Sequence, residues 1–150
     1  MNDRDVCHPT RMTPTCVPFM EETERYKKGL EIRREVLGND HVDRALAKVN
    51  EFNGPFQEFI TRYAWGEIWE RDGLSRRDRS LVTLAMLIAL NREAEFRMHV
   101  RAAFRNGVTL EELRELLLHS GVYCGLPAAN AAIRAAEEVI SEVKDRPGSS

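Results

Sequence analysis

Three charged or titratable residues lie at helical spacing between positions 92 and 99, where they could take part in acid–base chemistry. In a helix, Arg92, Glu95 and His99 share one face, because residues three and four positions apart are neighbours on the helix surface. A carboxylate one turn from an imidazole can fix its tautomer or raise its pKa, as in a general acid or base. The same spacing also occurs where a boundary histidine is simply salt-bridged on a helix surface, so both interpretations remain open.

A second set of polar residues precedes this segment. Arg79 and Ser80 would share a helix face with Arg76 and Thr83, so the polar start of this helix runs directly into its apolar part. An arginine in that position can bind a carboxylate through two parallel hydrogen bonds. The alternative interpretation is a solvated basic turn.

Other kinds of site find little support. Cys7, His8 and Cys16 offer at most three zinc ligands without an evident fourth, so we expect no metal site. The sequence has no phosphate-binding glycine loop and no HExxH motif. Its aromatic residues do not interleave with a basic groove, so we expect no nucleic-acid partner.

The elements that must position these residues are predicted to be helices. Apolar residues recur at helical spacing, and no segment shows the sustained alternation of a strand. The sequence therefore predicts an all-α fold, a compact bundle of about six helices. Ser75, and Thr109 followed by Glu112, are typical helix starts, and Gly38 and Gly107 are typical helix ends. The expected helices are 21–37, 41–50, 56–69, and those that begin at Ser75, near Arg92, at Thr109 and at Leu126.

Composition and length place this bundle in a single soluble domain. We expect an irregular or disordered arm over residues 1–18, which hold three prolines, a domain over 19–143, and a flexible tail over 144–150. A formal charge of −2 does not favour a polyanion partner, and no apolar run approaches the ~18 residues of a membrane span. Three sparse cysteines and the lack of a secretory signal at the start predict a cytoplasmic protein.

The segment Leu81 to Leu90 is apolar around nearly its whole circumference. Such a helix must be covered on all sides, which six short helices from one small chain would struggle to do. We therefore expect a homo-oligomer in which this helix packs between subunits; an unusually well wrapped monomer is the alternative.

Four segments resemble the carboxymuconolactone decarboxylase family: Asn50 to Trp69, Arg79 to Met86, Asn91 to His99, and Tyr123 to Asn130. The resemblance covers roughly residues 24–143, and the arm 1–18 has no counterpart. It implies an alkylhydroperoxidase-like fold assembled as a trimer or hexamer, with sites near subunit contacts. Peroxidase-like members of the wider superfamily carry Cys-x-x-Cys-x-x-x-His, and this chain has Arg92 and Glu95 at the two cysteine positions. Thiol redox chemistry is therefore disfavoured.

The resemblance further implies cofactor-free decarboxylation of a lactone dicarboxylate, 4-carboxymuconolactone, to 3-oxoadipate enol-lactone in protocatechuate breakdown (the β-ketoadipate pathway). On that basis we expect His99, tuned by Glu95, to be the general acid, and Arg79 and Arg92 to bind the acetate carboxylate. Ser80 or His99 would stabilise charge on the lactone oxygen. The alternatives are a non-catalytic oligomeric scaffold, a family member with another small carboxylated substrate, and a thiol peroxidase-like redox protein. Phe52, Phe56 or Trp65 would form an apolar wall around the leaving carboxylate, and Tyr123 is a further possible donor.

Overall fold

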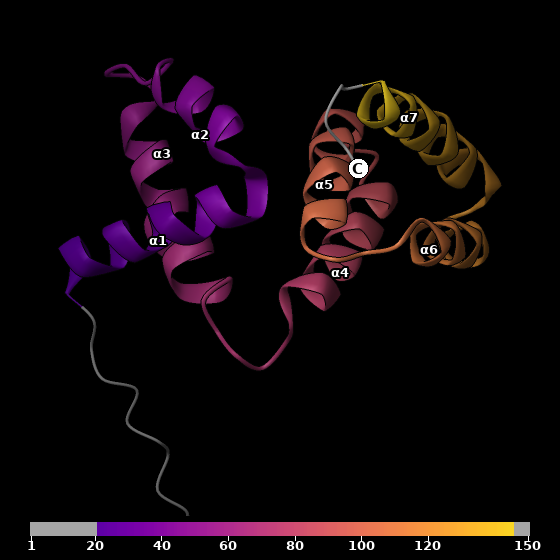
Figure 1. The fold of residues 1–150 in the computed structure, drawn as a ribbon, viewed down its shortest axis with the longest axis horizontal. Helices are drawn as coiled ribbons and strands as arrows, with labels where there is room; N and C mark the ends of the chain where they lie inside the picture. The colour runs from indigo at the N-terminus through magenta and orange to yellow at the C-terminus, as the bar shows by residue number, and fades with distance from the viewer. Residues whose placement is uncertain (1–20, 146–150) are drawn as a thin grey trace, which may run out of the picture.

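The computed structural model describes residues 21–145, and this part of the chain is all-α, as predicted (Figure 1). It has seven α-helices and one π-helix. The seven expected helical segments become eight because the one over 56–69 divides into an α-helical and a π-helical part. The arm 1–18, with Cys7 and Cys16, and residues 146–150 lie outside the described residues. The elements are α1 (Glu22–Leu37), α2 (Asn39–Leu46), α3 (Gly54–Phe59), η1 (Ile60–Ile68), α4 (Arg76–Ala89), α5 (Glu93–Arg105), α6 (Leu110–Tyr123) and α7 (Leu126–Lys144).

The predicted helix ends are confirmed where polar capping groups mark them. The Ser75 side chain accepts a hydrogen bond from the Asp78 backbone N–H, which satisfies an otherwise unpaired donor at the start of α4. Thr109 and Glu112 form a full capping box at the start of α6. Gly38 ends α1 with φ +88°, a conformation that residues with a Cβ rarely adopt.

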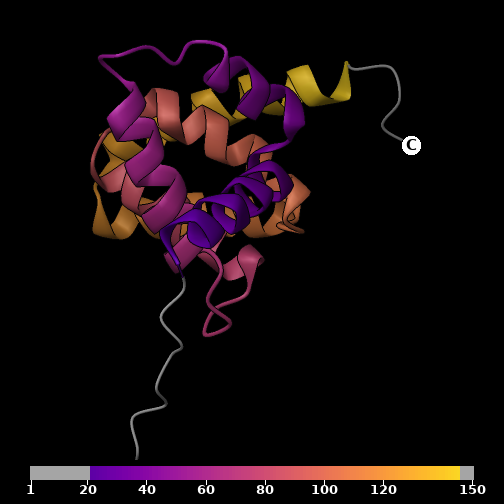
Figure 2. The same cartoon turned by 90° about the vertical axis from the view of Figure 1, so that its left-hand side faces the viewer.

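The helices form two groups, each with its own apolar core. In Figure 1, α1 to α3 lie on one side and α4 to α7 on the other, and Figure 2 shows the N-terminal group facing the viewer. Leu84, Phe96 and Val100 belong to the core of the C-terminal group, whereas Ile32 and Trp65 belong to the other. Helix α5 joins the two, because it also packs against α1 and contributes Ala102 to the N-terminal core. The expected compact bundle therefore has two cores with α5 between them.

Helices α1 and η1 approach each other closely at two glycines. A Cβ at Gly29 would lie 1.9 Å from the Thr61 carbonyl oxygen, and one at Gly66 would lie 2.3 Å from the Arg25 carbonyl oxygen. Both obstacles are backbone atoms, which cannot move aside as a side chain can. The contact between α1 and η1 therefore depends on the absence of side chains at these two positions.

We expect Gly29→Ala to lower the free energy of unfolding by about 2–3 kcal/mol, the upper part of the range for overpacking a core. The gain in helix propensity of roughly 1 kcal/mol that alanine brings in a helix interior is too small to offset the clash. Urea unfolding followed by circular dichroism measures the change. Gly73→Ala is the matched control, because nothing lies within 4 Å of a Cβ at that position. Equal stability of the two variants would contradict the close approach.

Helix α4 is not covered on all sides within one chain. Leu84 and Ile88 are buried, but Val82, Met86 and Leu90 are 44%, 59% and 66% exposed. These three residues follow one another at four-residue intervals and so form a single apolar stripe on the outer side of α4. Among residues 21–145, none of the helices has the length and apolar character needed to cross a membrane.

Candidate active site

His99 lies on α5 where that helix meets the N-terminal group. Its side chain is only 9% exposed, and its ring stacks on the Trp69 indole with centroids 6.4 Å apart and an interplanar angle of 18°. Trp65 packs in turn against Trp69 in a tilted arrangement with centroids 5.2 Å apart, so the imidazole has an aromatic wall on one side. Burial in this apolar setting lowers the pKa of His99 to about 4, with a smaller contribution from His41 in the same direction. The ring is therefore neutral at pH 7 in the free protein.

No hydrogen bond joins Glu95 to His99. Glu95 is exposed at the surface of α5, and the Nδ1 atom of His99 is buried without a hydrogen-bond partner. The charge of Glu95 does act to raise the pKa of His99, but burial outweighs it. The direction of the Glu95 effect is thus the one expected, and the low pKa of His99 results from desolvation of the buried ring, which is the stronger effect.

Ser80 does not lie free in a substrate site. Its side chain is 1% exposed. Its hydroxyl donates to the Arg76 carbonyl oxygen at 2.9 Å, and the hydroxyl oxygen of Ser80 accepts from Asn106 Nδ2 at 2.9 Å. The hydroxyl proton is thus already used within the chain. This arrangement argues against the expected role of Ser80 as a donor to the lactone oxygen.

The two arginines expected to bind carboxylate are not brought together with His99 in one pocket. Arg79 donates to the Arg71 carbonyl oxygen at 2.8 Å, which ties its guanidinium to the segment between η1 and α4. Arg92 is exposed and lines a shallow pocket with Phe96 and residues of α4 and α7, within the C-terminal group. His99 instead faces the N-terminal group through Trp69.

The expected aromatic wall is only partly present in the single chain. Trp65 is 7% exposed and supports Trp69, which sequence reasoning did not select. Phe52 and Phe56 are 95% and 61% exposed, so neither covers the imidazole within the chain. Tyr123 is exposed as well and packs at a tilt against the exposed His119 of α6.

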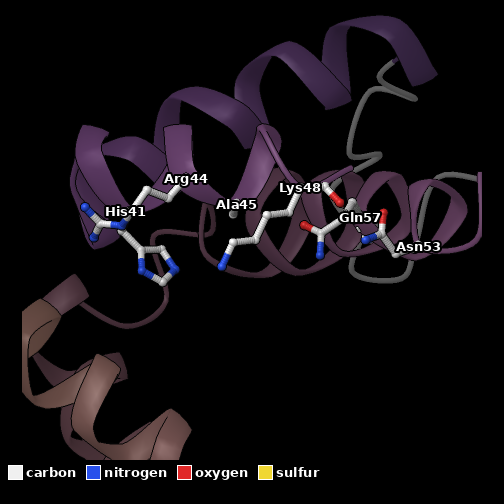
Figure 3. A pocket seen from close by; sticks show the side chains of 6 residues that line it. All are labelled: His41, Arg44, Ala45, Lys48, Asn53 and Gln57. Carbon is white, nitrogen blue, oxygen red and sulfur yellow. Dashed lines mark hydrogen bonds between the residues drawn. The ribbon is translucent and has the colours of Figure 1, made fainter. Parts of the chain in front are cut away.

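A cavity of about 350 Å³ opens between α2 and α3 (Figure 3). His41 and Arg44 of α2 line it together with Lys48, which follows the end of α2, and the imidazole of His41 and the amine of Lys48 point to the same side in the figure. Burial, followed by the charges of Arg33, Arg44, Arg101 and Arg105, lowers the pKa of His41. The cavity therefore has a positive electrostatic environment. Its lining is completed by Ala45, Asn53 and Gln57, and contains no acidic residue.

The sequence interpretation missed this cationic group. His41 stood between Asp40 and Asp43, which is typical of an ordinary helix start. The sequence of α1 could have indicated it, because Arg33 shares the buried face of that helix with Gly29 and Val36. A charged residue on an apolar helix face is rarely buried without a reason, so its position pointed to the site.

The arrangement can bind an anion and hold a neutral imidazole out of water. The ring of His99 responds to charge on His41, so the cationic cavity and the buried imidazole belong to one electrostatic environment. A bound anion would favour the protonated form of His99, because opposite charges stabilise each other. Among residues 21–145, no group of three or more histidine, cysteine, aspartate or glutamate side chains is arranged to hold a metal ion.

Comparison with known proteins gives a consistent family. The model of the carboxymuconolactone decarboxylase family matches residues 54–138, which include His99. A 4-carboxymuconolactone decarboxylase from Acinetobacter baylyi is 59% identical over 124 residues, covering 83% of this chain and 92% of that protein. A nitrosuccinic acid decarboxylase from Metarhizium robertsii is 40% identical over 121 residues, covering 81% of this chain and 85% of its own. The chain therefore belongs to the carboxymuconolactone decarboxylase family.

Proposed function

We propose that the chain is a carboxy-lyase that converts 4-carboxymuconolactone to 3-oxoadipate enol-lactone and CO₂ in protocatechuate breakdown. The observation that carries this proposal is the 59% identity to the Acinetobacter protein of that name over nearly its whole length. A second relative is also named as a decarboxylase, which supports the same reaction type. A non-catalytic scaffold would have no use for a buried, unpartnered imidazole beside a cationic cavity.

The substrate supplies its own electron sink. The carboxylate that leaves is attached to a ring carbon conjugated through C=C to the lactone carbonyl. When the C–C bond to CO₂ breaks, its electron pair moves through that system to the lactone oxygen and forms a dienolate. We therefore propose that no organic cofactor or metal takes part. The carbon α to the carbonyl must then gain one proton, so the reaction consumes a proton overall.

His99 is the side chain that we propose supplies that proton. In the free protein the pKa of His99 is about 4, so the ring is neutral at pH 7. A dianionic substrate placed beside it raises the pKa of the ring, and the imidazole takes up a proton as the substrate binds. After CO₂ leaves, the protonated ring donates to the dienolate carbon. The stacked Trp69 and the burial of the ring exclude water from this step.

The direct test is an assay of purified protein with 4-carboxymuconolactone that follows CO₂ release. We expect stoichiometric CO₂ and enol-lactone. Nitrosuccinic acid is the comparison substrate, because the relative from Metarhizium robertsii is named for it. Turnover of nitrosuccinic acid without turnover of the lactone would replace the first substrate by the second, and turnover of neither would overturn the enzymatic proposal.

We also propose that the protein is a cytoplasmic homo-oligomer. The apolar stripe of Val82, Met86 and Leu90 supports assembly, because three large apolar side chains on one helix face favour burial against a partner. Phe52, Phe56 and Tyr123 add further exposed aromatic surface. A second copy of the chain is the partner that the proposal names.

We expect the protein to sediment as a trimer or hexamer and Met86→Glu to shift it to smaller species. The substitution places a charge in the middle of the stripe, and burying that charge without a partner is unfavourable. Met86→Leu is the control, because it keeps an apolar side chain of similar volume. Analytical ultracentrifugation measures the assembly state. A monomeric wild-type protein, or a Met86→Glu variant of unchanged size, would contradict the proposed role of α4.

A further inference from the structure

Arg33 on α1 is a buried cation without a carboxylate partner. Its side chain is 4% exposed, and its guanidinium donates to Gln57 Oε1 at 3.1 Å and Thr61 Oγ1 at 3.3 Å, both neutral acceptors. Its Nε atom is buried without any partner. Buried charges in proteins are normally paired, because removing an ion from water is costly. Most other arginines of the described chain do form ion pairs, for example Arg34 with Asp43 at 2.7 Å. Arg33 is therefore a buried positive charge that an anion could neutralise.

The cavity between α2 and α3 lies next to this buried cation. Gln57 connects the two, since it lines the cavity and its Oε1 atom accepts the hydrogen bond from Arg33. Arg44 and Lys48 at the cavity also form no ion pair within residues 21–145. Arg44 and Lys48 thus line the cavity and Arg33 lies behind Gln57, and no acidic residue lines the cavity. In Figure 3 the amine of Lys48 lies between His41 and Gln57.

These cations lie outside the part of the chain that the family model matches. The match begins at residue 54, whereas Arg33, Arg44 and Lys48 precede it. His99 lies within the match. The imidazole therefore belongs to the region described by the family as a whole, and the cationic cavity comes from the N-terminal group of helices. A site for a substrate group remote from the reacting bond fits this position.

The compounds named by the two relatives share such a group. In 4-carboxymuconolactone, the ring carbon that loses CO₂ also carries a carboxymethyl arm. In nitrosuccinic acid, the carbon next to the nitro group carries one carboxylate directly and a second through a CH₂ group. Both compounds are therefore substituted succinates with an electron-accepting group at the reacting carbon. A protein that accepts this class must hold the carboxymethyl carboxylate apart from the one that leaves.

We infer that the cavity lined by Arg44 and Lys48, backed by Arg33 through Gln57, binds the carboxymethyl arm of substituted succinates. The inference rests on the proposed function and extends it to a substrate class. Arg44 and Lys48 supply charge-assisted hydrogen bonds to the retained carboxylate. The positive charge of Arg33, which lies behind Gln57, stabilises the same carboxylate. The leaving carboxylate then lies on the His99 side, where the surroundings are apolar and its loss is favoured.

Binding of succinate tests the site without turnover. We expect succinate to bind the wild-type protein more tightly than propionate, which lacks the second carboxylate. We expect the double variant Arg44→Met/Lys48→Met to weaken succinate binding roughly 10- to 100-fold, as for the loss of hydrogen bonds between charged groups, and to abolish the preference over propionate. Isothermal titration calorimetry measures both ligands. Both side chains are exposed, so the variant should fold as the wild type does.

Arg114→Met is the matched control, because it removes an exposed cation from α6, away from the cavity. Equal weakening of succinate and propionate in the double variant, an equal effect in the control, or no succinate binding to the wild type would each overturn the inference. With 4-carboxymuconolactone, the double variant should raise KM while kcat changes little. A lowered kcat at unchanged KM would also overturn it. Intact succinate binding without any decarboxylation would contradict the proposed function and leave the anion site standing.

Discussion

Replacing His99 by glutamine is expected to lower kcat by about 10²–10⁴-fold, the usual range for a positioned general acid. Glutamine keeps a polar group near the position of the ring nitrogens but cannot deliver a proton to the dienolate carbon. The variant should keep its fold, because removing a buried imidazole leaves the apolar contacts of α5 with both cores in place. Steady-state kinetics with 4-carboxymuconolactone give kcat and KM, and circular dichroism checks the fold.

Two controls separate chemistry from structure. His119→Gln makes the same substitution at an exposed histidine of α6 and should leave kcat unchanged. Glu95→Gln should have only a small effect, because Glu95 is exposed and acts on His99 through charge rather than a hydrogen bond. A His99→Gln enzyme with near-normal kcat would remove the imidazole from the mechanism. A large loss in Glu95→Gln would instead restore the role that the sequence first indicated.

The fold was largely predictable from local chemistry. Ser75, Thr109 and Gly38 mark helix ends through hydrogen bonds or backbone conformations that involve only a few neighbouring residues. The division of 56–69 into α3 and η1 was not predictable in this way. It coincides with the place where Gly66 meets the backbone of α1, a contact between residues far apart in the sequence. Helical periodicity carries no information about such a contact.

The candidate site was predictable at one residue and less so around it. His99 stood out because its type and position on α5 are local properties. Its low pKa depends on burial against Trp69, an effect of tertiary packing that outweighs the charge of the neighbouring Glu95. The cationic cavity combines residues of α2, of α3 and of the segment between them, with Arg33 of α1 behind Gln57, and helical spacing within any one element does not relate them. Arg79 and Arg92 have the side chain expected to bind a carboxylate, but neither lies in a pocket with His99.

The buried imidazole also makes the stability of the protein depend on pH. The pKa of His99 is about 4 in the folded chain and about 6.5 in an unfolded one. Above pH 6.5 the ring is neutral in both states and its burial opposes folding least. As the pH falls below 6.5, the unfolded chain binds a proton that the folded chain does not, so stability is lost. The loss is complete near pH 4, where the folded form also becomes protonated, and amounts to about 3 kcal/mol.

We therefore expect His99→Gln to lose about 3 kcal/mol less unfolding free energy than the wild type between pH 7 and pH 4. Urea unfolding at fixed protein concentration at each pH measures both losses. The carboxylates paired with arginines act in both proteins alike. Because the charge on His41 also lowers the pKa of His99, the comparison is made in a His41→Gln background, where the difference isolates His99. Parallel losses in the two proteins would mean that His99 is not held neutral. It would then already carry its proton in the free protein at mildly acidic pH, and substrate binding would not be needed to supply it.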